Sequence, residues 1–225
     1  MNTHLLFNFA TRSRPHKFKA AIDNIVSMCR TNEYTILVKA DTDDNTMNNR
    51  EMIDWMAKIP QIVVAWGLSE SKIHAINRDI DKVQVWDILI NMSDDMYFLV
   101  PGFDFRIIEL FKHHNSTDIF LHLPDGHTGD AISTLSIIGR DYYARDGYVY
   151  VPAYKSLFCD NEATEMAKNR GCYKWHNEKL YEHRHPANGW GQGDAQLRRT
   201  ESHFYTDQAI YEKRKSLGFP KTSVL

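Results

Sequence analysis

Two adjacent carboxylates, Asp94 and Asp95, directly follow a short apolar run and are well placed to do chemistry. The run Ile88–Ile90 predicts a buried strand of a parallel sheet. Two neighbouring carboxylates at the end of such a strand are costly to keep ionised without a cation. Open α/β sheets bind their ligands at the carboxyl ends of the strands. We therefore expect a divalent cation held by oxygen ligands here, with a phosphate on its other side.

The two aspartates are not expected to share one role, because adjacent side chains of an extended chain point to opposite faces. We assign the metal contact to Asp95 and expect Asp94 to face a ligand hydroxyl or a water molecule. The alternative interpretation is an acidic turn after a strand, which requires no metal.

The N-terminal part of the chain alternates strands and helices, a pattern typical of a parallel, doubly wound sheet. Pro15 suits the first turn of the first helix, and Ser13 is a candidate cap for it. The expected strands are 5–10, 34–38, 61–66 and 88–90, and the expected helices are 15–29, 47–58 and 71–82.

Beyond Pro101-Gly102 the polar loops become longer. The length of 225 residues suits one α/β domain with a substantial core. We expect one domain, with a nucleotide-type half of about residues 1–100 and a substrate half of about residues 101–225. The expected helices there are 105–113, 161–168 with Asp160 as the cap, and 207–215, and the expected strands are 119–122, 133–138 and 148–151.

Composition excludes some classes of protein. A net charge of −2 gives no electrostatic reason to expect binding to nucleic acid or to an anionic membrane. The three cysteines lack Cys-x-x-Cys spacing and favour a reducing compartment without disulfides. We recognise no signal peptide and no run as long as a transmembrane helix, so we expect a cytoplasmic protein. Basic residues near the end leave peripheral attachment to a membrane as an alternative.

Several motifs, in their order along the chain, resemble those of a small GT-A-fold glycosyltransferase of the broad group that includes the family-2 enzymes. Ser93-Asp-Asp95 resembles the Asp-x-Asp metal motif, with serine in place of the first aspartate. Lys72-Ile-His-Ala-Ile-Asn77 resembles a Gly-Lys-x-x-Ala-x-Asn stretch, with serine where glycine is usual. The other matching segments are Ala10–Pro15, Lys39–Asp44, Cys159–Glu162 and His183–Pro186, and the resemblance covers roughly residues 4 to 215.

This resemblance implies a GT-A-type α/β fold, with a mostly parallel, Rossmann-like sheet flanked by helices and an acceptor-side half of mixed strands and loops. It implies a hexosyltransferase-like enzyme that moves a sugar from a nucleotide-diphosphate sugar to an unidentified acceptor hydroxyl, assisted by Mn²⁺ or Mg²⁺, with inversion. Such a transfer requires a neutralised diphosphate, a deprotonated hydroxyl and their alignment.

The resemblance also implies roles in catalysis and metal binding. Asp95 would contact the metal, and His185 would complete the site, with His183 as its rival, because imidazole suits Mn²⁺ better than Mg²⁺. Asp160 would be the general base, with Glu162 as the alternative. A position at a helix N-terminus also explains Asp160 without catalysis, and it would lower the carboxyl pKa.

The nucleotide sugar would be contacted from several loops. Asp41 and Asp43 lie two apart on an extended segment, so they share a face from which one can bind the base or ribose. Lys72 can pair with phosphate or with Asp94. We expect Trp190 at the tip of a glycine-rich flap over the sugar, or else packed inward. The loop after the first strand would contribute Thr11, Arg12 and Arg14.

Other functions remain alternatives. A nucleotidyltransferase shares the sheet, but we would expect a glycine-rich phosphate loop near Arg12, and no glycine is present there. A non-catalytic relative would keep the nucleotide site without turnover. A zinc site formed by Cys159, Cys172, His176 and His183 matches no common ligand spacing.

Overall fold

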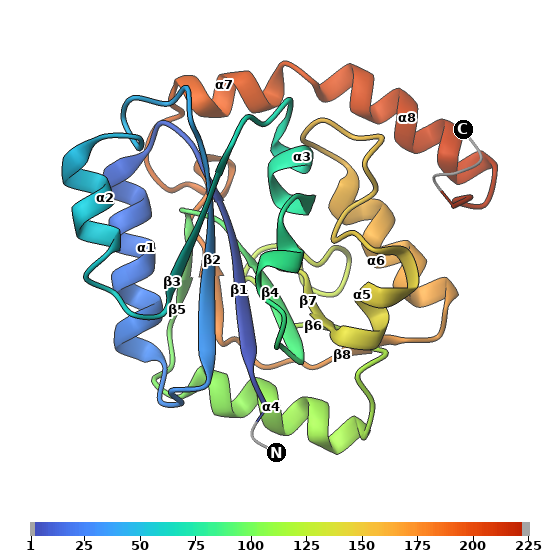
Figure 1. Cartoon of the computed structure of the whole chain (residues 1–225). Coiled ribbons are helices and arrows are strands. Elements are labelled where there is room, and N and C mark those ends of the chain that lie inside the picture. Colours follow the sequence, from blue (N-terminus) through green and yellow to red (C-terminus); the bar gives the residue numbers. More distant parts are fainter. Residues whose placement is uncertain (1–2, 222–225) are drawn as a thin grey trace.

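Seven strands form one sheet in the order β3-β2-β1-β4-β7-β6-β8 in the computed structural model, which describes residues 3–221 (Figure 1). The first four strands, β3-β2-β1-β4, pair in parallel. Because a parallel sheet is covered on both faces, its central strands are almost entirely buried and apolar. The buried strands are β1 (Leu5–Thr11), β2 (Tyr34–Asp41) and β4 (Ile88–Met92), whereas β3 (Ile62–Gly67) lies at the edge of the sheet and is only partly buried.

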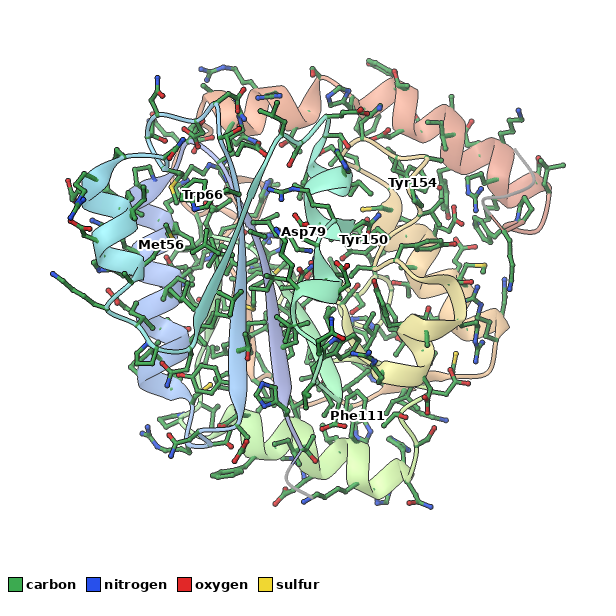
Figure 2. The ribbon with its side chains drawn as sticks, viewed as in Figure 1. Met56, Trp66, Asp79, Phe111, Tyr150 and Tyr154 are labelled. Carbon is green, nitrogen blue, oxygen red and sulfur yellow. The ribbon has the colours of Figure 1, made fainter. Side chains whose placement is uncertain are left out.

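Helices cover both faces of this sheet and enclose two apolar cores (Figure 1). Alternate residues of β1 point into different cores, so Leu5 and Phe7 lie in one and Leu6 lies in the other. Figure 2 shows Met56 and Trp66 on the side of the first core and Tyr150 and Tyr154 on the other. The first core is covered by α1 (Pro15–Met28) and α2 (Arg50–Met56), and the second by α3 (Lys72–Asn77), α5 (Arg140–Asp146) and α6 (Cys159–Asn169).

The rest of the sheet contains both antiparallel and parallel pairs. β7 (Ile137–Gly139) pairs antiparallel with β4 and with β6 (Phe120–His122), and β8 (Tyr173–Trp175) pairs parallel with β6. A separate antiparallel pair, β5 (Met96–Phe98) and β9 (Tyr181–His183), places Met96 opposite His183. This pair brings a late histidine beside the residues that follow β4.

Three helices lie at the two ends of the sheet (Figure 1). α7 (Ala195–Glu201) and α8 (Phe204–Ser216) cross the end at which β1 and β2 finish, and α4 (Phe103–His114) lies at the opposite end. Short 3₁₀ turns occur at Ile80–Lys82 and Pro186–Asn188. None of the helices within residues 3–221 combines the length and the apolar character needed to span a membrane.

Several predicted helix ends are wrong. The helix predicted over 71–82 ends at Asn77, and Asp79 follows with a φ of 61°, a left-handed conformation that interrupts the helix. Ser13 does not cap α1, because its φ is 62° and its backbone N–H donates to Asp44 instead. Asp160 is not the N-cap of α6, because the helix already begins at Cys159.

The strand predicted over 148–151 is also wrong, although its apolar residues are buried. The side chain of Asn77 bonds to both N–H groups of Val149 and Tyr150 and to the Tyr150 carbonyl, so this segment needs no strand partner. The predicted strand 133–138 is reduced to β7. The elements that the sequence analysis missed are β5, β8, β9, α5 and α7.

Candidate active site

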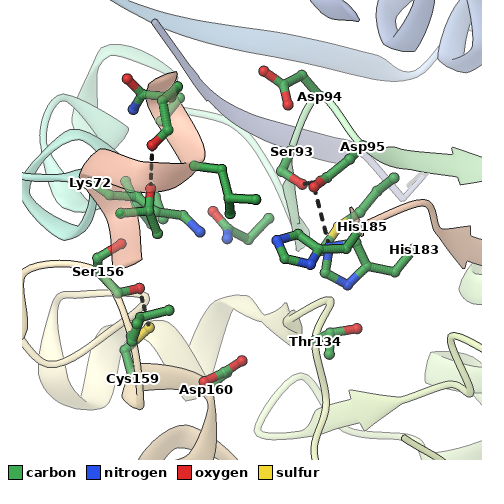
Figure 3. Close-up of a pocket in the computed structure, with 18 of the residues that line it drawn as sticks. Lys72, Ser93, Asp94, Asp95, Thr134, Ser156, Cys159, Asp160, His183 and His185 are labelled. Carbon is green, nitrogen blue, oxygen red and sulfur yellow. Dashed lines mark hydrogen bonds and ion pairs between the residues drawn. The ribbon is translucent and has the colours of Figure 1, made fainter. Parts of the chain in front are cut away.

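A pocket of about 470 Å³ lies at the carboxyl ends of β1 and β4, beneath α7 (Figure 3). This volume is in the range of small-molecule sites. The elements that form it are distant in sequence and meet only because parallel strands end at one edge of the sheet. Its charged and imidazole side chains include Lys72 from α3, Asp94 and Asp95 after β4, Asp160 from α6, His183 from β9, and His185.

Both oxygens of Asp95 have partners. The Ser93 hydroxyl donates to Oδ1, and Nε2 of His183 lies 3.5 Å from Oδ2 (Figure 3). Burial opposes ionisation of Asp95, but its contacts with His183 and Ser93 outweigh burial and lower the pKa of Asp95 below its ordinary value. Ser93, which replaces the first aspartate of the expected motif, thus orients the second one.

The residues around Asp95 provide suitable but incomplete metal coordination. His185 lines the pocket beside His183, with ring centroids 5.4 Å apart, and its Nδ1 accepts a hydrogen bond from the Ala187 N–H. In the neutral ring this bond places the proton on Nε2, so His185 would bind a cation only after that bond is broken or the proton moves to Nδ1. Burial lowers the pKa of His185, so the imidazole is kept neutral.

Within residues 3–221, no three His, Cys, Asp or Glu side chains are grouped so that they could hold a metal ion by themselves. A Mg²⁺ or Mn²⁺ ion held by Asp95, with His185 as a second ligand after a change of tautomer, would need phosphate oxygens and water as its other ligands. The zinc site considered above is excluded for the same reason within the described residues. No three of its four proposed ligands, Cys159, Cys172, His176 and His183, are grouped so that they could hold a metal.

Asp94 has different partners from its neighbour. It is buried and forms an ion pair of 3.0 Å with Arg14, not with Lys72. Arg14 also contacts Asp194, the N-cap of α7, at 2.6 Å, and Lys17 reaches the same carboxylate at 3.1 Å. Arg14 thus joins the loops after β1 and β4 to the helix that covers the pocket.

Asp160 faces the pocket from the side opposite Asp95 (Figure 3). Burial raises the pKa of Asp160, while the charge of Lys72 and the backbone N–H of Asn161 offset this only in part. The effect of the helix N-terminus, which favours a low pKa, is therefore outweighed. A carboxylate with a raised pKa in a pocket is suited to accept a proton.

Glu162 does not reach the pocket. It is fully buried, and its carboxylate accepts hydrogen bonds from the Tyr154 hydroxyl at 2.6 Å and from two nitrogens of Arg214 at 2.8 Å each. Since Arg214 belongs to α8, this ion pair fixes α8 against α6. The position of Glu162 thus indicates a structural role.

We expect Glu162→Gln to lower the free energy of unfolding by about 3–5 kcal/mol, because the charge of Arg214 would stay buried without its partner. The matched control is Glu165→Gln on the same helix, which weakens a more exposed ion pair with Lys215 and should cost below about 1 kcal/mol. Urea denaturation of both variants measures the difference. Equal, small losses would contradict the structural role of Glu162.

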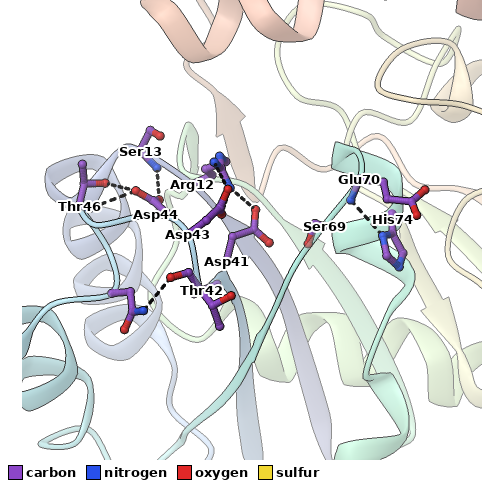
Figure 4. A network of polar contacts seen from close by, with 12 residues as sticks. Arg12, Ser13, Asp41, Thr42, Asp43, Asp44, Thr46, Ser69, Glu70 and His74 are labelled. Atoms are coloured by element: carbon purple, nitrogen blue, oxygen red, sulfur yellow. Dashed lines mark hydrogen bonds and ion pairs between the residues drawn. The ribbon is translucent and has the colours of Figure 1, made fainter.

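A smaller hollow adjoins the pocket at the ends of β1 and β2, and several residues that were expected to contact the nucleotide line it. Arg12 lies there between Asp41 and Asp43, with contacts of 2.7 and 2.6 Å (Figure 4). Thr11, Arg12 and Asp41 line the hollow, whereas Asp43 is exposed and lines neither cavity. Lys72 lines both cavities, and its ammonium forms no ion pair with residues 3–221.

Trp190 does not occupy the position expected of a flap over the sugar. It is 43% exposed, lines neither cavity, and packs against the guanidinium of Arg184 at 5.0 Å. The glycines on either side have φ angles of 87° and 68°, which only glycine adopts without strain.

The sequence analysis missed two aspartates that shape the site. Asp194 caps α7 by accepting from the Leu197 N–H at 2.9 Å, and an aspartate three residues before an apolar position was the available signal. Asp207 is buried in α8 and accepts hydrogen bonds from the N–H groups of 155–157 at 2.8–3.0 Å. These bonds fix the loop that leads to Asp160, and no local pattern reveals them.

No family model and no curated protein matches this sequence, but solved structures do. The mannosyltransferase PcManGT from Pyrobaculum calidifontis, solved with GDP-Man and Mn²⁺, is 11% identical with a TM-score of 0.63, over 79% of this chain and 55% of that one. S. aureus TarS 1–349 is 11% identical with a TM-score of 0.63, over 80% and 59%. A complex of TarS 1–349 with UDP-GlcNAc also matches.

A third match is a cytidylyltransferase from Leptospira borgpetersenii, 15% identical with a TM-score of 0.51, over 80% of this chain and 77% of that one. The fold of this chain is therefore the GT-A fold that the sequence motifs predict. The chain spans somewhat more than half the length of PcManGT and of TarS 1–349.

Proposed function

We propose that this chain, with its GT-A fold, is a glycosyltransferase that moves a sugar from a nucleoside-diphosphate sugar to an acceptor hydroxyl. The observation that carries the proposal is the pair Asp95 and Asp160, which face one pocket from opposite sides with pKa values shifted in opposite directions. Such a pair suits a reaction in which one carboxylate stays ionised and the other exchanges a proton.

The donor would lie across both cavities. Its nucleoside would lie in the hollow lined by Thr11, Arg12 and Asp41, and its diphosphate would lie between Lys72 and Asp95. A Mn²⁺ or Mg²⁺ ion held by Asp95 and His185 would supply positive charge to the leaving diphosphate. The ammonium of Lys72 supplies further positive charge from the opposite wall.

Arg14, Asp94 and Asp43 take supporting roles in this proposal. Arg14 is already paired with Asp94 and Asp194, so we assign it to positioning the loop after β4 and α7 rather than to the donor. Asp43 holds the guanidinium of Arg12 in place beside Asp41.

Asp160 would act as the general base. The acceptor oxygen bonds to the anomeric carbon while the bond from that carbon to the diphosphate oxygen breaks, and the hydroxyl proton passes to the Asp160 carboxylate. The electron pair of the broken bond leaves with the diphosphate. Because Asp160 lies across the pocket from Asp95, attack from the face opposite the leaving group is favoured, and this attack inverts the anomeric centre.

A thermal-shift screen tests donor binding. Uridine, guanosine, cytidine and thymidine diphosphates and their sugars are each compared with Mn²⁺ and with a chelator. We expect one nucleotide class to raise Tm in the presence of Mn²⁺. At a concentration of about 100 times Kd the gain should be about 2.7 kcal/mol, or about 5–10 °C. The absence of a shift with every nucleotide would contradict the proposal.

A second candidate, a nucleotidyltransferase, is favoured by the likeness to the cytidylyltransferase structure. Against it, the loop after β1 has no glycine, and Arg12 is bound by two carboxylates instead of being available to a triphosphate. Release of pyrophosphate from a nucleoside triphosphate and a sugar phosphate would establish this alternative.

A further inference from the structure

Three aromatic side chains lead from the pocket out to solvent. Phe158 and Phe204 both line the pocket, with ring centroids 5.2 Å apart, and Tyr205 packs against Phe204 at 5.4 Å. Phe204 is 42% exposed and Tyr205 is 82% exposed. We name Phe158, Phe204 and Tyr205 the aromatic strip.

Phe158, at the inner end of the aromatic strip, is held in a strained backbone conformation. Phe158 has a φ of 60° and a ψ of −5°, a left-handed conformation that is strained for a residue with a bulky side chain. Asp207 fixes the three preceding N–H groups, and the ring of Phe158 stacks on Tyr211 at 5.7 Å. Strain of this kind persists where surrounding contacts over-determine it, often at a ligand site. The left-handed conformation of Phe158 places its aromatic ring at the pocket, two residues before Asp160.

The polar side chains that α6 and α7 contribute to the same pocket are neutral or acidic. α7 contributes Gln196, Thr200 and Glu201, and α6 contributes Asn161 after Asp160. Amide, hydroxyl and carboxylate groups bond to hydroxyls, and aromatic faces pack against apolar C–H surfaces. A sugar ring has both kinds of surface. At the α7 side of the pocket, the carboxylate of Glu201 disfavours an anionic acceptor.

We propose that the aromatic strip binds the rings of a neutral saccharide acceptor and directs its terminal hydroxyl toward Asp160. The strip is continuous with the pocket, so a chain of sugars lying on Tyr205 and Phe204 enters beside the general base. The role as acceptor rests on the proposed function, whereas saccharide binding to the strip does not require a donor.

The test measures saccharide binding without a donor, by ligand-observed NMR and calorimetry. The probes are cellotetraose, maltotetraose, mannotetraose and N-acetylchitotetraose at up to about 10 mM. We expect the wild type to bind at least one of them. Tyr205→Ala and Phe204→Ala should weaken that binding by about fivefold or more, while Tyr205→Trp should preserve it. The matched control is Leu217→Ala, an exposed apolar residue at the far end of α8, which should bind as the wild type does.

Three results would overturn the inference: no binding of any probe, binding that Tyr205→Ala leaves unchanged, or Tyr205-dependent binding to phosphatidylserine vesicles instead of saccharides. The exposed position of Tyr205 makes an effect on folding small. Nucleotide binding by the same samples separates this inference from the proposed function. If the protein binds a nucleotide but shows no saccharide binding that depends on the aromatic strip, only this inference is overturned. If it shows such saccharide binding but binds no nucleotide, the glycosyltransferase proposal is overturned, while saccharide binding to the strip stands.

Discussion

Replacing Asp160 with asparagine is expected to lower turnover by at least about 100-fold and to leave the affinity for the nucleotide sugar intact. Asparagine keeps the shape of the side chain but cannot accept the proton of the acceptor hydroxyl. Steady-state kinetics gives the turnover, and calorimetry with the donor gives Kd. Asp130→Asn, which changes an exposed aspartate outside the pocket, is the control and should retain full turnover. Full turnover by Asp160→Asn would exclude Asp160 as the base.

The pH dependence gives a second test of the same residue. Since burial raises the pKa of Asp160, turnover should fall with decreasing pH at a midpoint above about 3.9, the value for an unperturbed aspartate. The folded state binds this proton more tightly than the unfolded state, so ionised Asp160 destabilises the fold above its raised pKa. Asp160→Asn should therefore leave the free energy of unfolding unchanged or increase it. A clear loss of stability would instead indicate a structural role.

Replacing Asp95 with alanine is expected to abolish the effect of metal on nucleotide binding. The substitution removes the carboxylate that we assign to the cation, so affinity in Mn²⁺ should fall by at least about 100-fold, to the value measured with a chelator. Calorimetry with the nucleoside diphosphate, with and without Mn²⁺, provides the measurement.

The adjacent residue provides the control for Asp95. Asp94→Ala breaks the ion pair with Arg14 but keeps the proposed metal ligand, so binding should still increase with Mn²⁺. An equal response to Mn²⁺ in Asp95→Ala and the wild type would contradict the metal assignment. A response lost only in Asp94→Ala would move the assignment to its neighbour.

The parallel half of the fold was predictable because its signals are local. β1, β2 and β4 are short apolar runs, and burial on both faces requires such runs. Parallel strands end at one edge of the sheet, so the carboxylates after β4 were expected to face a ligand there. The structure places Asp94 and Asp95 in that pocket, with different partners.

The remaining features depend on contacts between distant parts of the chain. The contact between His183 and Asp95 follows from the pairing of β5 with β9, two three-residue strands without a clear pattern. Asp160 and Glu162 look alike in the sequence, and only the buried Arg214 from α8 separates their roles. Segment 148–151 looks like a strand because the bonds from Asn77 have no local signature.

The central claim is that the pocket between Asp95 and Asp160 transfers a sugar. The most direct test is the release of nucleoside diphosphate from the nucleotide sugar that binds, in Mn²⁺ and in a chelator, with saccharide acceptors present. We expect metal-dependent release by the wild type and at least about 100-fold slower release by Asp160→Asn. Tight binding of the nucleotide sugar without release under any of these conditions would contradict the claim and indicate a non-catalytic nucleotide-binding protein.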